Sequence, residues 1–439
     1  MARLASALVL ASLTACGGYD NPAPACDLVS RQSALRNYFF DWYFWYALSP
    51  SPPPGSAPTL DEYFSSLLYT GTDPTFPADR WSHHQSTASF VQFFGLGQTL
   101  SYGLAVAGLE VTTPVPQPAA PLWVRYVEPR SPAAAAGVVR GDRVVSVNGR
   151  AASDMIAAND FSLLTPSAPG ETIQLVLDNG AGPRTVDVVA SVFPLTTVPA
   201  ASVVTSPGGR AMGYLMVNNL LDQAVPSMAS AFASFASRGV TELVIDLRYN
   251  DGGFVSIGRL LASYVNPALT AGRPYASLLF SDKRAGANTV YPFITPANSL
   301  ALTRVYVLQG PRTCATAEQV INALRPFVSV VQIGDGSCGR PVGFQAVDDG
   351  CGETYSVVNF ETVNASNEGR YFNGLDPQCV VAEDFGKALG APDEPLLATA
   401  RNHADGIACP VAAAAARQRP PAARQSPGVD GARAGMIAR

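Results

Sequence analysis

The sequence predicts an α/β protein, because short apolar strands alternate with helical segments between residues 196 and 410. We expect strands at 211–217, 242–247, 304–308 and 328–333, and helices at 225–237, 257–264 and 315–324. Such alternation is typical of βαβ crossovers on a largely parallel sheet. With 439 residues, the chain exceeds one ordinary hydrophobic core, so two or three domains are expected.

The composition is that of a globular protein. Apolar residues make up 47% of the chain, charged residues 14%, and the net charge is −5. This balance implies no nucleic-acid partner. Only three histidines are present, at 83, 84 and 403, and their spacing predicts packing or surface roles. We expect no metal site and no cofactor.

The N-terminal segment 1–16 carries one arginine and then a short apolar run that is too short to span a bilayer. It reads as an export signal. Because Cys16 follows small residues and precedes two glycines, the segment resembles a bacterial lipoprotein signal with Cys16 as the lipidated residue. Simple secretion and a chance cysteine are the alternatives. Residues 17–25 would be a tether from membrane to domain, which places the protein in the bacterial envelope, facing the periplasm.

Aromatic residues with helical spacing concentrate at 37–46, inside a predicted N-terminal helical cap at 26–94. Packing against the next domain is the more common use of such residues, and an aromatic ligand box is the alternative. At the other end, residues 411–439 are rich in Ala, Arg, Pro and Gly. They predict a disordered tail, and contact with anionic lipid is a further option.

Residues 95–195 differ in character from the rest. A strand at 122–127, a short helix after Ser131 and a glycine turn at 137–141 lead to an alternating strand that ends in an Asn-Gly turn. This stretch resembles a PDZ domain. The resemblance puts the carboxylate-binding loop at Tyr102, Gly103, Leu104 and Ala105, where free amides would hold the C-terminus of a peptide that adds a strand to the sheet. A glycine turn without a ligand is the alternative.

Three further segments carry a second resemblance. Residues 243–253 form an apolar strand that runs into a glycine turn, 312–318 read Arg-Thr-Cys-Ala-Thr-Ala-Glu, and 338–343 read Cys-Gly-Arg-Pro-Val-Gly. Together they are similar to the C-terminal processing peptidases, or tail-specific serine proteases. In that family a serine attacks the peptide carbonyl and a neutral lysine accepts its proton. The resemblance places Ala315 at the serine position and Arg340 at the lysine position.

The same resemblance implies an oxyanion hole from the backbone amides near Gly252 and Gly253 and from that of Thr316. These donors do not depend on the side chains at 315 and 340. An alanine methyl cannot attack a carbonyl, and a guanidinium, with a pKa of about 12 or above, cannot act as the base. Thr316, Ser337, Lys283 and Lys387 are the residues available for rescue, but none is in register with the motifs.

The leading hypothesis is therefore a lipid-anchored peptidase homologue that binds protein C-termini and has lost hydrolysis. The alternatives are an active serine peptidase, a form inactivated by design to trap substrate, and a structural lipoprotein with a vestigial groove.

Apart from Cys16, six cysteines remain in a chain predicted to reach an oxidising compartment, so three disulfides are expected. We expect Cys314 to pair with Cys338, Cys351 with Cys379, and Cys26 with Cys409. A thiol nucleophile at Cys314 is the alternative use of that residue.

Overall fold

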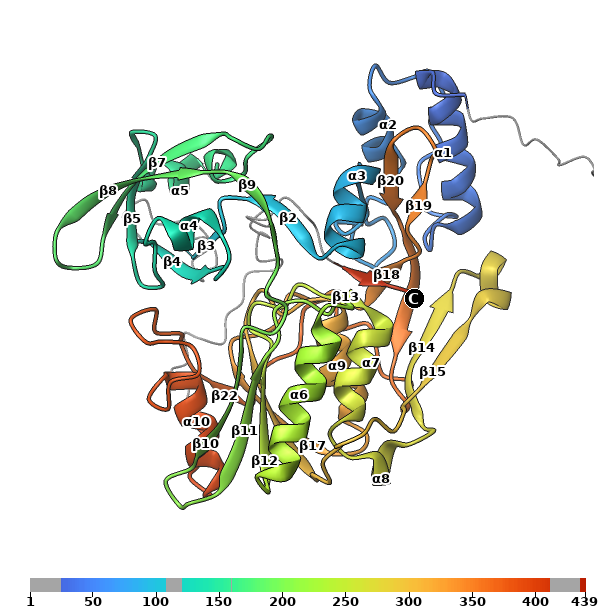
Figure 1. The fold of residues 1–439 in the computed structure, drawn as a ribbon. Helices are drawn as coiled ribbons and strands as arrows, with labels where there is room; N and C mark the ends of the chain where they lie inside the picture. Colours follow the sequence, from blue (N-terminus) through green and yellow to red (C-terminus); the bar gives the residue numbers. More distant parts are fainter. Residues whose placement is uncertain (1–24, 108–120, 159, 411–434) are drawn as a thin grey trace, which may run out of the picture.

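The computed structural model describes residues 25–107, 121–158, 160–410 and 435–439. Its fold is α/β, as predicted, with an N-terminal helical region, a small β-rich region and a larger core (Figure 1). The predicted signal at 1–16 with Cys16, tether residues 17–24 and tail residues 411–434 lie outside the described residues. Within the described part, every helix is too short or too polar to traverse a bilayer.

A six-stranded sheet forms the centre of the core. Its strands in spatial order are β10 (Ala200–Thr205), β11 (Ala211–Met216), β12 (Glu242–Asp246), β16 (Arg304–Gln309), β17 (Ser329–Gly334) and β22 (Cys379–Val380). Only β10 is antiparallel to its neighbour. The predicted strands and helices of this core agree with the observed ones to within two residues at each end.

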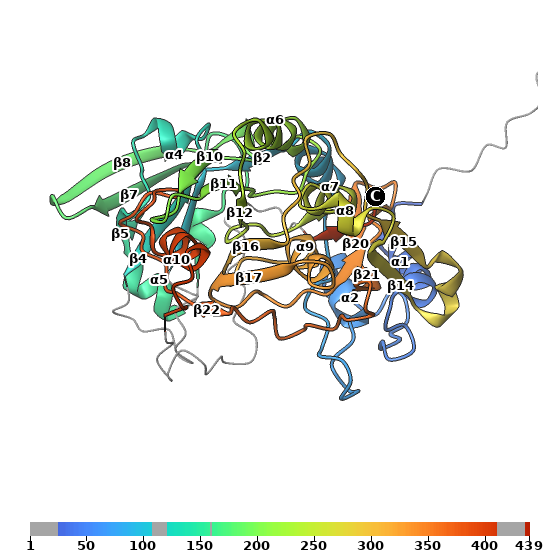
Figure 2. The same ribbon diagram turned by 90° about the horizontal axis from the view of Figure 1, so that it is seen from below.

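Helices cover both faces of this sheet (Figure 2). The helices are α6 (Ala224–Ser237), α7 (Val255–Ser263) and α9 (Thr316–Leu324) on one face and α10 (Pro395–Ala404) on the other. Alternate residues of β12 serve the two layers: Leu243 and Ile245 pack in the cluster with α6, α7 and α9, while Val244 packs in the cluster with α10. Burial on both faces explains why the middle of this strand, residues 243–245, is an apolar run.

A second, mixed sheet abuts α7 and α9. In spatial order it contains β13 (Gly253–Phe254), β23 (Met436–Ile437), β18 (Val342–Phe344), β21 (Val358–Val363), β14 (Pro274–Phe280) and β15 (Thr289–Pro292). The helices α8 (Pro267–Thr270) and 282–287 accompany it. Several of these strands are only two or three residues long, too short to show a hydrophobic period in the sequence.

The N-terminal region contains α1 (Leu28–Trp42), α2 (Leu60–Leu67), β1 (His83–Ser86), α3 (Thr87–Phe90) and a π-helical turn at Val91–Gly95. It packs on the hairpin of β19 (Val347–Asp348) and β20 (Glu353–Ser356). Phe39, Tyr43 and Trp45 are at most 3% exposed and belong to the main hydrophobic cluster. The aromatic run therefore serves packing rather than a ligand box.

The β-rich region has a hydrophobic cluster of its own. It comprises β2 (Gln98–Ser101), β3 (Leu104–Ala107), β4 (Leu122–Val127), α4 (Pro132–Ala135), β5 (Arg143–Val147), β6 (Arg150–Ala151), α5 (Ala152–Ala158), a 3-10 turn at Ser162–Leu164, β7 (Thr172–Asp178), β8 (Pro183–Val189) and β9 (Ser191–Pro194). Among the described strands, the main sheet order is β3-β4-β5-β7-β8, with β3 at an edge. An edge strand is the element that a peptide can extend.

Two of the three predicted disulfides are wrong. Cys314 pairs with Cys338 as predicted, but Cys26 pairs with Cys351, and Cys379 pairs with Cys409. The predicted Cys351–Cys379 bridge fails because β20 and β21 carry the chain away from Cys351 into another sheet before it reaches Cys379. Cys351 instead lies at the β19–β20 turn against α1, where Arg31 pairs with Asp349. Cys379 starts β22, and Cys409 follows α10, which packs on the same sheet.

The prediction of a disordered tail over 411–439 is wrong for its last residues. Residues 436–437 form β23, Met436 is fully buried, and Ile437 is 6% exposed. The segment as a whole is poor in large apolar residues, but Met436 and Ile437 lie next to each other in this strand. The strand β23 consequently lies in the second sheet, beside β18 (Figure 1).

Candidate active site and carboxylate loop

Ala315 occupies a strained backbone position at the start of α9. It has φ 53° and ψ −115°, a conformation that costs energy for any residue other than glycine. The Cys314 amide donates to the Asn250 carbonyl at 2.9 Å, and the Thr313 hydroxyl donates to the Leu247 carbonyl at 2.8 Å. These bonds fix the turn before α9 against the end of β12. In hydrolases a sharp turn of this kind, between a strand and a helix, presents the nucleophile. Here the residue at that turn is alanine, so the turn presents only a methyl group.

Glu318, one turn into α9, joins the two sequence motifs. Its buried carboxylate accepts hydrogen bonds from the amides of Ala315 (3.0 Å), Gly339 (2.8 Å) and Arg340 (2.8 Å), and from the Ser337 hydroxyl. Burial raises the pKa of Glu318, and these hydrogen bonds oppose that shift. The carboxylate therefore holds the nucleophile position and the base position in one geometry. The Cys314–Cys338 disulfide joins the same two loops covalently.

Arg340 is buried, with 4% of its surface exposed. A second arginine, Arg80, lies close enough to interact with it: burial and then the charge of Arg340 lower the pKa of Arg80, and the Glu318 carboxylate acts in the opposite direction. Arg80 donates to the Phe372 carbonyl at 3.0 Å. The site is therefore a buried carboxylate accompanied by two guanidinium groups, with no obvious proton acceptor at position 340.

The Gly252-Gly253 turn requires glycine at both positions, with φ values of 115° and 137°. A Cβ at Gly253 would collide with the Leu220 carbonyl oxygen. The Gly252 amide donates to the Asn250 side chain at 2.9 Å, while the Gly253 amide donates to the Gly435 carbonyl at 2.7 Å. Of the two, only Gly253 thus points its amide at an external carbonyl. Thr316 occupies the first helical position, where its amide has no intrahelical acceptor.

Three of the four residues of the predicted carboxylate loop line a pocket between the β-rich region and the core, whereas Tyr102 is buried in the hydrophobic cluster of the β-rich region. Gly103, Leu104 and Ala105 face it from the loop, and Arg312 faces it from the segment leading into Ala315. The other lining residues are Thr99, Arg125, Tyr126, Glu128, Phe193, Leu195, Asn218, Asn219 and Tyr249. One loop amide, that of Gly103, already donates to the Ser101 hydroxyl at 2.9 Å, so it is not one of the free amides that the resemblance implied.

The comparisons with known proteins agree with this architecture. The sequence profile of Peptidase family S41 matches residues 211–381, and that of a PDZ domain matches residues 123–177. A crystal structure of a Bacteroides fragilis protein assigned to the S41 proteases aligns with a TM-score of 0.69 and 26% identity, over 85% of this chain and 97% of that one. This chain belongs to peptidase family S41 and carries a PDZ domain.

The curated relatives of this S41 protein are C-terminal processing proteases. CtpB of Bacillus subtilis is 23% identical over 58% of this chain and 51% of that protein. The chloroplastic C-terminal processing peptidase of Tetradesmus obliquus is 26% identical over 53% of this chain and 51% of that protein. The chain thus matches about half the length of these relatives.

In this S41 protein, each of the four residues considered for rescue of catalysis already makes a hydrogen bond or an ion pair. The Thr316 hydroxyl donates to the Gly253 carbonyl at 2.8 Å, and that of Ser337 donates to Glu318. The Lys283 ammonium donates to the Phe40 carbonyl at 2.6 Å, and Lys387 pairs with Asp393 at 2.6 Å, which raises the pKa of Lys387. A cationic lysine cannot accept a proton.

Sequence reasoning missed two contributors to the site of this S41 protein. Arg80 lies in the N-terminal helical region, and only the fold brings its charge close to Glu318 and Arg340. Gly435 lay in a segment read as disordered. No sequence pattern could have linked either residue to the site, because both lie far along the chain from the motifs around Ala315 and Arg340.

Proposed function

We propose that this S41 family member captures the C-terminal segments of client proteins and does not hydrolyse them. The observation that carries the proposal is a backbone arrangement suited to binding a peptide carbonyl, combined with side chains at positions 315 and 340 that cannot attack it. The strained turn at position 315, the Glu318 clamp and the Gly253 amide are all in place, while the side chains are a methyl and a guanidinium. A site of this kind can bind a peptide carbonyl without attacking it.

Client recognition would begin at the PDZ domain. β3 offers an edge for strand addition, and the carboxylate loop opens on a pocket that also contains Arg312. A guanidinium near backbone amides favours a free carboxylate. The proposed clients are protein C-termini of the bacterial envelope, and the proposed anchor is a lipid on Cys16, which would hold the protein at the periplasmic surface. The protein would then act as an adaptor, decoy or regulator.

Binding of a fluorescent peptide with an apolar C-terminus tests this function. We expect C-terminal amidation to weaken binding about tenfold or more, because it removes a charge-assisted interaction. The Arg312→Gln variant should weaken binding of the free-carboxylate peptide by a similar factor, with little further effect of amidation.

Arg273→Gln is the matched control, because Arg273 is exposed and does not line the pocket. Equal affinity for the acid and the amide would contradict carboxylate capture. Cleavage of the peptide by the unmodified chain would instead support an active peptidase, the activity that the family membership suggests.

A further inference from the structure

The last residues of the chain complete the second sheet at the candidate active site. β23 pairs in parallel with β13, Met436 opposite Gly253 and Ile437 opposite Phe254. On its other side, Ile437 pairs with Phe344 of β18, and the Ala438 amide donates to the Phe344 carbonyl at 3.0 Å. β13 follows the Gly252 turn and β18 follows Arg340. The strand β23 therefore fills the space between β13, which begins at the candidate oxyanion donor, and β18, which follows the base position.

The carbonyl of Gly435 and the side chain of Ala315 both lie close to Gly252. A point one bond from the Gly252 Cα, where a Cβ would stand, is 2.5 Å from the Gly435 oxygen, 3.0 Å from its carbonyl carbon and 3.1 Å from the Ala315 Cβ. The same oxygen accepts a hydrogen bond from the Gly253 amide at 2.7 Å. The Gly435 carbonyl thus binds the candidate oxyanion donor of Gly253, in the neighbourhood of the side chain at position 315.

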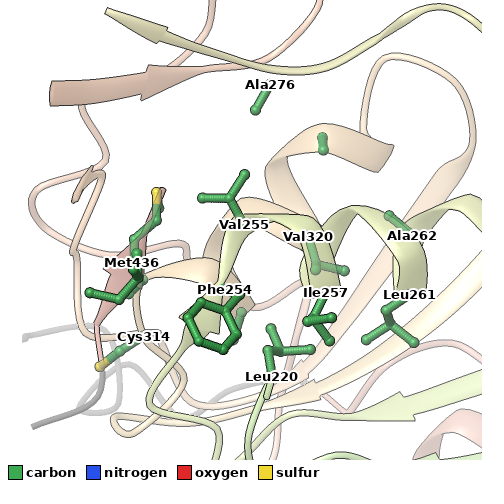
Figure 3. Packing of buried hydrophobic residues seen from close by; sticks show 14 of the residues in the cluster. Leu220, Phe254, Val255, Ile257, Leu261, Ala262, Ala276, Cys314, Val320 and Met436 are labelled. Atoms are coloured by element: carbon green, nitrogen blue, oxygen red, sulfur yellow. The ribbon is translucent and has the colours of Figure 1, made fainter. Parts of the chain in front are cut away.

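Side chains of the segment fit their surroundings. A Cβ at Gly435 would lie 2.5 Å from the Phe344 ring and 3.5 Å from the Arg340 guanidinium, so this position selects glycine. Met436 is buried in the same cluster as Phe254, Val255 and Cys314 (Figure 3), and its sulfur lies 3.3 Å from the Gln319 side-chain amide. Arg439 pairs with Asp222 at 2.8 Å and lies over the Phe254 ring.

We propose that residues 435–439 are an intramolecular peptide ligand of this cleft, so that the protein's own C-terminus competes with client segments for it. The cleft takes a strand with glycine at the carbonyl-binding position, followed by a long unbranched apolar residue. It recognises the main chain and does not require a terminal carboxylate. This proposal rests on the proposed assignment of the cleft as the peptide site, but not on carboxylate capture by the PDZ loop.

The test uses the amidated peptide Ala-Gly-Met-Ile-Ala-Arg-NH2, labelled at its N-terminus, which the PDZ loop should not retain. A covalently attached ligand commonly competes at a millimolar effective concentration. We therefore expect a chain truncated after residue 434 to bind this peptide at least about tenfold more tightly than the full chain. The peptide with valine in place of glycine should bind the truncated chain at least about tenfold more weakly, because its side chain meets Phe344.

The full-length Gly435→Val variant provides a second route to an open cleft and should also gain peptide affinity. Its control is Val290→Ala, a change of an exposed side chain on β15 that should leave binding at the level of the full chain. Equal peptide binding by the full chain, the truncated chain and the Gly435→Val variant would overturn the proposal. That result would leave the carboxylate test of the PDZ loop unaffected, and a failed carboxylate test would leave this one unaffected.

Discussion

A double variant carrying Ala315→Ser and Arg340→Lys is expected to hydrolyse an unfolded protein substrate, whereas Ala315→Ser alone stays inactive. The backbone at 315 already has the conformation that a nucleophile needs, so a serine can be added without rebuilding the turn. A serine beside Arg340 has no group to take its proton. A lysine at 340 would be buried near the charge of Arg80, and both effects favour its neutral, proton-accepting form.

Loss of a nucleophile can reduce kcat by a factor on the order of 10⁶, so even partial restoration should exceed the unmodified chain by at least about 10³. The measurement is cleavage of a tail-tagged substrate, followed by gel and mass spectrometry, with Arg340→Lys alone as the matched control. Hydrolysis by Ala315→Ser alone would show that Arg340 does not block the site. Hydrolysis by the unmodified chain would refute the loss of activity itself.

Glu318→Ala is expected to cause the largest loss of stability among single changes at the site, about 3–5 kcal/mol in the free energy of unfolding. The change leaves three buried amides and one hydroxyl without their shared acceptor, and each unsatisfied buried group costs about 1–3 kcal/mol before the loops relax. The carboxylate's own burial penalty, which raises its pKa, offsets part of this cost.

Urea unfolding followed by circular dichroism, with the disulfides intact, measures this loss. Glu62→Ala is the control, because Glu62 is an exposed residue in the first turn of α2, where a carboxylate contributes about 1 kcal/mol at most. If the midpoint of Glu318→Ala matches that of the control, the carboxylate does not clamp the two loops.

The parallel sheet could be predicted from the sequence because its strands are buried on both faces and its helices are regular. Residues 243–245 and 305–308 are short apolar runs bounded by polar residues, and their burial in the structure explains the pattern. The motif segments around Ala315 and Arg340 could also be located. Their meeting at Glu318, with a disulfide beside it, follows from the three-dimensional fold.

The second sheet could not be predicted because its strands depend on pairing rather than on pattern. Gly253–Phe254, Val342–Phe344 and Met436–Ile437 are too short to show alternation, and they lie next to one another only in the folded sheet. The disulfide errors have the same origin. Proximity in the sequence suggested Cys351–Cys379, whereas the sheets place Cys351 against α1 and Cys379 against α10.

The Cys26–Cys351 bridge determines how the molecule would respond to a pull on its N-terminal end. Residue 26 lies two positions before the first residue of α1, and its partner lies 325 residues further along the chain, in the turn between β19 and β20. Tension applied ahead of residue 26 would pass through a covalent bond into the sheet and would not peel α1 from its hydrophobic contacts. A chain held to a surface from that side could therefore bear mechanical load while its helices stayed folded.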